Sequence, residues 1–194
     1  REYFQGRECN ASSIRDLEKA VINLAWFHRA GRELYMEENT SYTKKTPGNL
    51  DRKVNELRRI RNFVSRRTLK MYIKTFDYFY SQAEKCLSLF QDNFTYNDKW
   101  LGYCHGSYNY HSVMFCDGYI ATINFDRFHV GYQLMDLYQF LRKAMEKNRY
   151  DIAMAKDILS AYSQINYLEH EDYEFIYLMY SFPEKFWKIS NRYM

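Results

Sequence analysis

The chain has 194 residues, of which 46% are hydrophobic and 19% aromatic, so it can bury the core of one domain and is not intrinsically disordered. Its 28 basic and 24 acidic residues leave a net charge of +4, which is too small to indicate nucleic-acid binding. Only 2 Pro and 7 Gly occur, a composition that favours helices over a turn-rich β fold.

The first predicted helix begins after Ser13, which forms a variant of the capping box with Asp16. Apolar residues recur at helical spacing over residues 14–27. Gly31 is expected to end this helix as a C-cap glycine. That end would place His28 in the last turn, where a partial positive charge is favourable.

Residues 36–48 are polar and contain a Thr-Pro-Gly turn signal, so they are predicted to form a loop. A second helix is expected to start near Asn49 and a third to cover residues 68–91, each with one apolar stripe. Residues 92–99 are polar and are predicted to form another connecting segment.

The second helix carries a cluster of basic side chains, which we call the basic cluster: Arg52, Lys53, Arg58, Arg59, Arg61, Arg66 and Arg67. The simplest interpretation is the solvated face of an amphipathic helix. Alternatively, these side chains bind an acidic or phosphorylated partner, or a polyanion in a salt-sensitive manner.

The pattern changes at residues 112–116 and 119–123, which are short and β-prone. They are joined by Asp117-Gly118, a strong hairpin signal. Helical spacing then returns over residues 134–145, 152–162 and 173–179. Pro183 is expected to start a last segment that runs through Asn191. The sequence therefore predicts a mainly α chain with one small β-hairpin.

The hairpin lies inside an ordered set of motifs. His105-Gly106-Ser107 comes before it with Ser112 five residues further on, Ile123-Asn124-Phe125-Asp126 follows it, and Asp136-Leu137 comes later. This order resembles the aminoglycoside phosphotransferases, which carry His-Gly-Asp, four residues, Asn, a hairpin, Ile-Asp and then Asp-Leu. The resemblance implies that the first Asp handles the proton of the acceptor hydroxyl, while the Asn and the second Asp hold magnesium against the nucleotide.

A more specific resemblance is to spore coat proteins of the CotS type, which are kinase-like. It covers almost the whole chain and rests on His105-Gly-Ser-Tyr-Asn-Tyr-His111, on the segments 136–143 and 145–148, and on Pro183-Glu-Lys-Phe-Trp-Lys-Ile189. Residues 2–9 resemble the linker between the two lobes of that family. The resemblance implies synthesis in the cytoplasm of a spore-forming bacterium, deposition in the spore coat, and other coat proteins as partners. The sequence shows no signal peptide, and no membrane or nucleic-acid partner is expected.

The resemblance also implies a fold, the C-terminal lobe of a protein-kinase-like domain over residues 1–194. We expect an inter-lobe linker at 1–10, N-terminal helices at 11–100, a vestigial catalytic loop and hairpin at 101–131, and C-terminal helices at 132–194. The phosphate-binding lobe that would precede the linker is not represented in these residues. His105 and Asp136 are expected to support the loop rather than to catalyse.

This sequence departs from the phosphotransferase pattern at three positions. Ser107 replaces the catalytic Asp, Ser112 the metal-binding Asn and Asn124 the metal-binding Asp. A serine hydroxyl without a partner is not a general base at neutral pH, and Asn124 brings no charge to a metal. Asn124 and Asp126 are the only weak candidates for metal ligands.

These departures predict a catalytically inactive pseudokinase that acts as a structural or protein-binding component of the coat, with no cofactor. The alternative is an active phosphotransferase that uses ATP and magnesium on a small-molecule or protein hydroxyl, given an N-terminal lobe.

Four cysteines occur, at positions 9, 86, 104 and 116, without metal-site or redox spacing. Reduced thiols are the favoured interpretation, and a bridge between Cys104 and Cys116 on neighbouring strands is the alternative. The histidines at 105, 111 and 129 match no known ligand spacing either.

Overall fold

The structure is a computed structural model, and it describes residues 5–37, 46–65, 70–95 and 97–192. The chain divides into two compact units. The first comprises residues 1–42 and 97–172, and the second comprises residues 43–96 and 173–194. No helix within the described ranges is long and apolar enough to cross a membrane.

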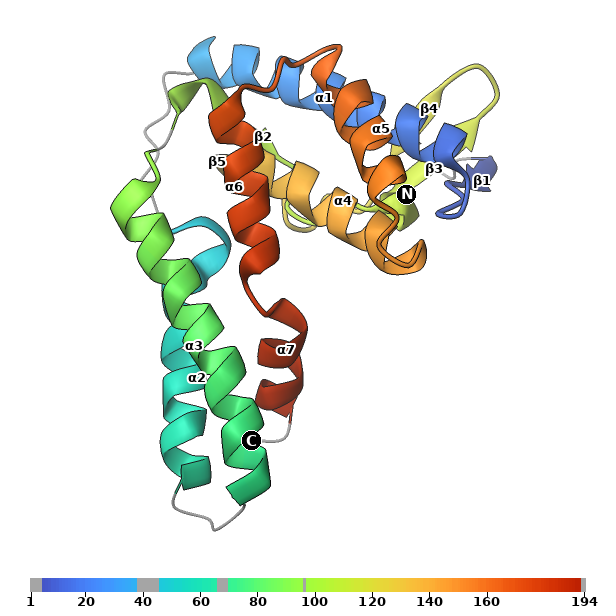
Figure 1. Cartoon of the computed structure of the whole chain (residues 1–194). Coiled ribbons are helices and arrows are strands. Elements are labelled where there is room, and N and C mark those ends of the chain that lie inside the picture. The colour runs from blue at the N-terminus through green and yellow to red at the C-terminus, as the bar shows by residue number, and fades with distance from the viewer. Residues whose placement is uncertain (1–4, 38–45, 66–69, 96, 193–194) are drawn as a thin grey trace. The chain divides into compact units, whose positions relative to one another are not determined.

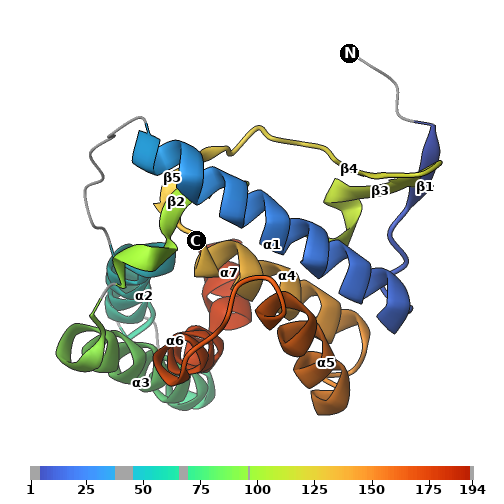
Figure 2. The same ribbon diagram turned by 90° about the horizontal axis from the view of Figure 1, so that it is seen from above.

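The first unit is organised around α1 (Ile14–Glu37), which contacts α4 (Leu134–Lys147), α5 (Ile152–Ser163) and strand β2 (Leu101–Cys104). Figure 2 shows α1 running from one small sheet of this unit to the other. Its N-terminus is capped as predicted, since the Ser13 hydroxyl accepts from the backbone N–H of Asp16 at 3.3 Å. The Asp16 carboxylate does not complete the capping box, because it accepts instead from the Asn10 N–H and from the Arg7 guanidinium.

The predicted end of this helix is wrong, because α1 continues six residues beyond Gly31 to Glu37. Gly31 is required for packing instead: a Cβ at this position would lie only 3.1 Å from the Tyr103 carbonyl oxygen and 3.3 Å from the Gln133 amide nitrogen. His28 is consequently not in a last turn. It is fully buried in the middle of α1, where burial lowers the pKa of its imidazole.

Two small antiparallel sheets complete the first unit. The predicted hairpin is present as β3 (Val113–Cys116) and β4 (Ile120–Thr122), and β1 (Gly6–Glu8) joins it in the order β1-β3-β4. The second sheet pairs β2 with β5 (His129–Tyr132) in a register that sets Leu101 opposite Tyr132. The sequence patterns did not predict β1 or β5, and they suggested a strand at Cys104 of β2 only as part of the alternative disulfide. Short 3-10 turns occupy Pro47–Asn49, Asp98–Trp100 and Tyr110–Ser112.

The second unit contains α2 (Leu50–Ser65), α3 (Lys70–Asn93), α7 (Glu184–Arg192) and most of α6 (His170–Ser181). The helices α2 and α3 lie side by side (Figure 1). Aromatic side chains fill the space between the helices: Phe186 of α7 stacks on Phe79 of α3 at 4.7 Å, and Phe175 of α6 meets Phe90 of α3 at 5.7 Å. Pro183 precedes α7, as expected for a helix start.

Candidate functional site

The segment with the phosphotransferase-like motifs starts directly after β2. At Gly106 the backbone takes a positive φ of 79°, and a Cβ at this position would lie 2.2 Å from the Arg127 carbonyl oxygen. Glycine is therefore the residue that fits this sharp turn, for both conformational and steric reasons. The turn directs the chain from β2 into the loop that precedes the hairpin.

Asp136, in the first helical turn of α4, stabilises this backbone bend at Gly106. Its two carboxylate oxygens accept hydrogen bonds from the backbone N–H groups of His105, at 2.6 Å, and Gly106, at 2.9 Å. The carboxylate is 1% exposed, and its place at a helix N-terminus favours its negative charge. The Nε2 of His28 lies 3.5 Å from it. Both carboxylate oxygens of Asp136 therefore already have hydrogen-bond partners within the protein.

The His105 imidazole is buried and bonded on both nitrogens. Its Nε2 lies 2.9 Å from the carbonyl oxygen of Ile123, which can only accept, so Nε2 carries the proton. The unprotonated Nδ1 then faces the backbone N–H of Ser107 at 3.3 Å and its hydroxyl at 3.5 Å. His105 therefore ties the loop after β2 to the segment that follows β4.

The hydroxyl groups of Ser107 and Ser112 make their contacts within the loop that carries them. Ser112 is 2% exposed, and its hydroxyl donates to the Ser107 carbonyl oxygen at 3.5 Å. The same carbonyl accepts from the Asn109 side-chain amide at 2.8 Å. The carbonyl of Ser112 accepts from the N–H of Ile123 at 2.9 Å. These contacts bring Ser107, Ser112 and the segment containing Asn124 together.

The segment after β4 is anchored by aromatic packing rather than by charge. Phe125 lies 4.7 Å from the His105 ring and also contacts Phe27 and Phe128, while Phe128 stacks on Tyr103 at 4.9 Å. Sequence reasoning named the motif around Phe125 but missed this cluster. The sequence did contain a signal for this cluster, because Tyr103, Phe125 and Phe128 lie in or next to the motifs at 105–107 and 123–126.

Asn124 and Asp126, the two candidate metal ligands, flank the anchored Phe125. Both are exposed, and Asn124 has a positive φ of 67°. The left-handed conformation is one that Asn tolerates better than most residues. The loop therefore presents one amide and one carboxylate to solvent.

These residues do not fit a magnesium–nucleotide site. Mg²⁺ binds through near-octahedral oxygen ligands and usually through one or two carboxylates. Here the three family positions supply a neutral amide and two hydroxyls, while the Asp136 carboxylate is occupied by backbone N–H groups. Within the described ranges, no group of three or more His, Cys, Asp or Glu side chains is placed to hold a metal ion.

In the basic cluster, most side chains of the described part are paired with acidic ones. Arg52 pairs with Glu56, Lys53 with Glu184, Arg58 with Glu84 and Arg61 with Asp77, at 2.6–3.3 Å. Arg59 is exposed, and Arg66 and Arg67 lie outside the described residues. Lys53 does not belong to a solvated face, since it is 8% exposed. The pairing reduces the positive potential that a polyanion would meet.

The cysteines are free thiols in the structure. Cys104 and Cys116 lie in different sheets, on β2 and β3, so the expectation that they occupy neighbouring strands is wrong. Burial raises the pKa of the Cys9 thiol to about 12 and that of Cys86 to about 11, which makes both unreactive at neutral pH.

No protein-family model and no curated protein matches the chain. Sixteen chains of solved structures do match it. One is an aminoglycoside phosphotransferase from Alicyclobacillus acidocaldarius, which superposes with a TM-score of 0.80 over 97% of this chain at 18% sequence identity. The chain spans 59% of the length of that structure.

This similarity establishes the fold. The mainly α arrangement with small antiparallel sheets is the fold of the matching part of that aminoglycoside phosphotransferase. The sequence-based prediction of the fold class is confirmed. The similarity concerns the fold alone, because unrelated activities share folds and function depends on the site.

Proposed function

We propose that this chain is part of a kinase-like protein that does not transfer phosphoryl groups and that serves as a structural or protein-binding component of a spore coat. The proposed loss of catalysis rests on one observation. At the three family positions for catalysis and metal binding, Ser107 and Ser112 are engaged by the loop and Asn124 brings a neutral amide. No group at these positions is a general base or an anionic ligand at neutral pH.

The coat assignment rests on the sequence resemblance to CotS-type proteins and is supported by the surface. Tyrosine combines an apolar ring with a polar hydroxyl and is frequent in protein interfaces. Among the described residues, six tyrosines are more than two-fifths exposed: Tyr78, Tyr119, Tyr150, Tyr167, Tyr173 and Tyr177. Such a surface suits a protein whose partners are other coat proteins.

Thermal unfolding with and without ATP and Mg²⁺ tests the loss of catalysis, and it should be measured on this chain and on the complete gene product. A ligand that binds only the folded state at 100 times its Kd stabilises it by about 2.7 kcal/mol. We expect no magnesium-dependent rise in Tm at saturating nucleotide. A clear rise would favour the alternative, an active phosphotransferase that uses Asn124 and Asp126.

A gain-of-site variant provides the matched control. Ser107→Asp, Ser112→Asn and Asn124→Asp together restore the residue types of the phosphotransferase pattern. We expect this variant, folded by circular dichroism, to bind Mn²⁺ in a magnesium-competitive manner that the natural chain does not show. Equal Mn²⁺ binding by both proteins would contradict the proposal.

The coat role is tested separately in the source cell. A fluorescent fusion expressed from its own promoter should appear during sporulation and concentrate at the spore periphery. A diffuse signal in vegetative cells would rule out the coat role without affecting the argument about catalysis.

A further inference from the structure

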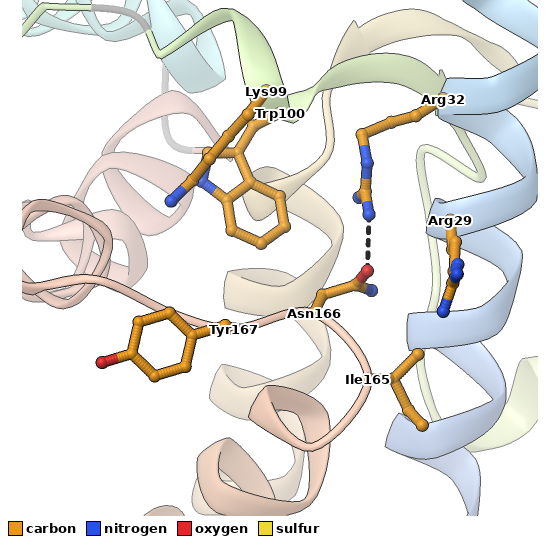
Figure 3. Close-up of a pocket in the computed structure, with 7 residues that line it drawn as sticks. All are labelled: Arg29, Arg32, Lys99, Trp100, Ile165, Asn166 and Tyr167. Atoms are coloured by element: carbon orange, nitrogen blue, oxygen red, sulfur yellow. Dashed lines mark hydrogen bonds between the residues drawn. The ribbon is translucent and has the colours of Figure 1, made fainter.

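A cavity of about 320 Å³ lies in the first unit, where the C-terminal part of α1 faces the 3-10 turn before β2 and the loop after α5. This volume is within the range of small-molecule sites. The lining side chains are Arg29, Arg32, Lys99, Trp100, Ile165, Asn166 and Tyr167, which are drawn in Figure 3. Three of the seven are cationic and none is acidic.

Of the three cations that line the cavity, Arg32 is the one with no carboxylate partner among the described residues. Its guanidinium donates to the side-chain oxygens of Gln133, at 2.8 Å, and Asn166, and it lies over the Trp100 ring at 5.3 Å. Burial lowers its pKa, which reports the cost of holding this charge away from water. Its guanidinium is also hydrogen-bonded to the Tyr162 hydroxyl. A guanidinium has five N–H groups, so donors remain for a ligand beside these three bonds.

The other two cations differ in how far they are neutralised. Lys99 pairs with Glu169 at 2.7 Å and with the buried Asp172 at 3.1 Å, so its charge is compensated outside the cavity. Arg29 is half exposed, pairs with Glu33 one turn along the helix at 3.5 Å, and lies over the Trp26 ring at 5.5 Å. Exposed pairs of this kind contribute little and exchange easily. The excess positive charge is therefore carried by Arg29 and Arg32, which lie three residues apart on the same helix.

The position of the cavity is rigidly defined. The Asn166 amide donates to the Ala25 carbonyl oxygen of α1 at 2.7 Å, which holds the loop after α5 against the helix. The Trp100 indole donates to Asp172 at 2.6 Å. Gln133, which accepts from Arg32, also donates to the carbonyl oxygens of His28 and Tyr103. Pre-positioned donors of this kind reduce the entropy cost of binding.

We propose that this cavity binds the phosphate group of a phosphomonoester, with the dianion held by the guanidinium groups of Arg29 and Arg32. The planar fork of a guanidinium matches two phosphate oxygens, and two arginines one turn apart match a dianion. The organic part of the ligand lies against Ile165 and Tyr167. The site is separate from the loop around Ser107, because the four residues of β2 separate them by about 13 Å.

Isothermal titration with inorganic phosphate, and then with O-phosphoserine, tests the site directly at constant ionic strength. We expect one saturable site with a Kd of about 1 mM or below. Arg29→Gln should weaken binding at least tenfold. Arg15→Gln removes the same charge from the exposed surface of α1 outside the cavity, and it should change binding less than twofold. Arg32→Lys, which keeps the charge but loses the fork, should weaken binding when its unfolding curve shows an intact fold.

Two results would overturn the proposal. One is the absence of saturable phosphate binding, and the other is an equal loss in Arg29→Gln and Arg15→Gln, which would indicate a diffuse charge effect. A third titration, with a peptide that contains phosphoserine, distinguishes the source of the group. A peptide that binds at least as tightly as O-phosphoserine assigns the site to a phosphorylated protein, and a peptide that is excluded assigns it to a small molecule.

Discussion

The carboxylate of Asp136 accepts a hydrogen bond of 2.6 Å from the backbone N–H of His105, thirty-one residues earlier in the chain. A second bond to the N–H of Gly106 occupies its other oxygen. These contacts fasten the N-terminus of α4 to the loop that would carry catalysis in a phosphotransferase. The loop is thus held through its backbone, whatever side chains stand at positions 107, 112 and 124. Under the proposed function, this loop is a retained scaffold.

Replacing this carboxylate should therefore destabilise the fold. In Asp136→Asn, the amide NH₂ group faces a backbone N–H that it cannot accept from, and a buried donor is left unsatisfied. We expect the free energy of unfolding in urea to fall by about 2–4 kcal/mol. Asp126→Asn is the matched control at an exposed position and should change it by less than about 0.5 kcal/mol. Equal effects of the two changes would contradict the assigned role of Asp136.

The buried His28 predicts a pH dependence of stability. Its ring contacts the Tyr162 hydroxyl at 2.7 Å and the Asp136 carboxylate at 3.5 Å, with the Arg32 guanidinium and the His105 ring nearby. Burial lowers the pKa of His28 in the folded protein, so the unfolded chain binds its proton first as the pH falls. Its contribution to stability is complete above about pH 6.5 and decreases below that pH toward the lowered folded-state pKa.

The measurement is a series of urea unfolding curves between pH 7.5 and pH 4.5 for the natural chain and for His28→Gln. We expect the difference between the two proteins to shrink with acidification, at up to about 1.4 kcal/mol for each pH unit between the two pKa values. A difference that stays constant with pH would show that His28 does not titrate on unfolding.

Two glycines with nearly the same φ should respond very differently to alanine. Gly118, in the hairpin turn, has φ 78° with nothing within 4 Å of an added Cβ, so Gly118→Ala should cost only the conformational strain, about 1–2 kcal/mol. Gly106→Ala adds a clash at 2.2 Å with the Arg127 carbonyl oxygen and should cost more than about 3 kcal/mol. Denaturant unfolding measures both. Similar losses would mean that the loop after β2 can shift freely.

Within the basic cluster, burial rather than charge should determine the effect of a substitution. Lys53 is 8% exposed, pairs with Glu184 at 2.7 Å, and has its pKa lowered by desolvation. Lys53→Met leaves Glu184 without this partner and should destabilise the second unit by about 2–3 kcal/mol. Arg61→Gln removes an exposed, solvent-screened pair and should cost about 0.5 kcal/mol or less. The comparison is read from unfolding curves, and a larger loss in Arg61→Gln would reverse this assignment.

Features with a local cause were predictable from the sequence. The repeating apolar positions of α2, α4 and α5 set the helical period, and Asp117-Gly118 set the hairpin, because each depends on residues a few positions apart. The candidate site came instead from the resemblance of its ordered motifs to the phosphotransferases, and the roles of its residues stay a prediction. Ser107, Ser112 and the segment of Asn124 do come together in the structure.

Features that join distant residues were decided only by the tertiary structure. Strands β2 and β5 are four residues each and exist because they pair with one another across the loop and hairpin between them. The helix α1 passes Gly31 because a glycine there lets Tyr103 approach, whereas the local pattern predicts a C-cap. The pairs of Lys53, Arg58 and Arg61 with acids, the burial of His28 and the cavity at Arg32 likewise depend on partners that no local spacing reveals. Local propensity sets where elements form, and long-range packing and charge pairing decide where they end and which side chains remain available for binding.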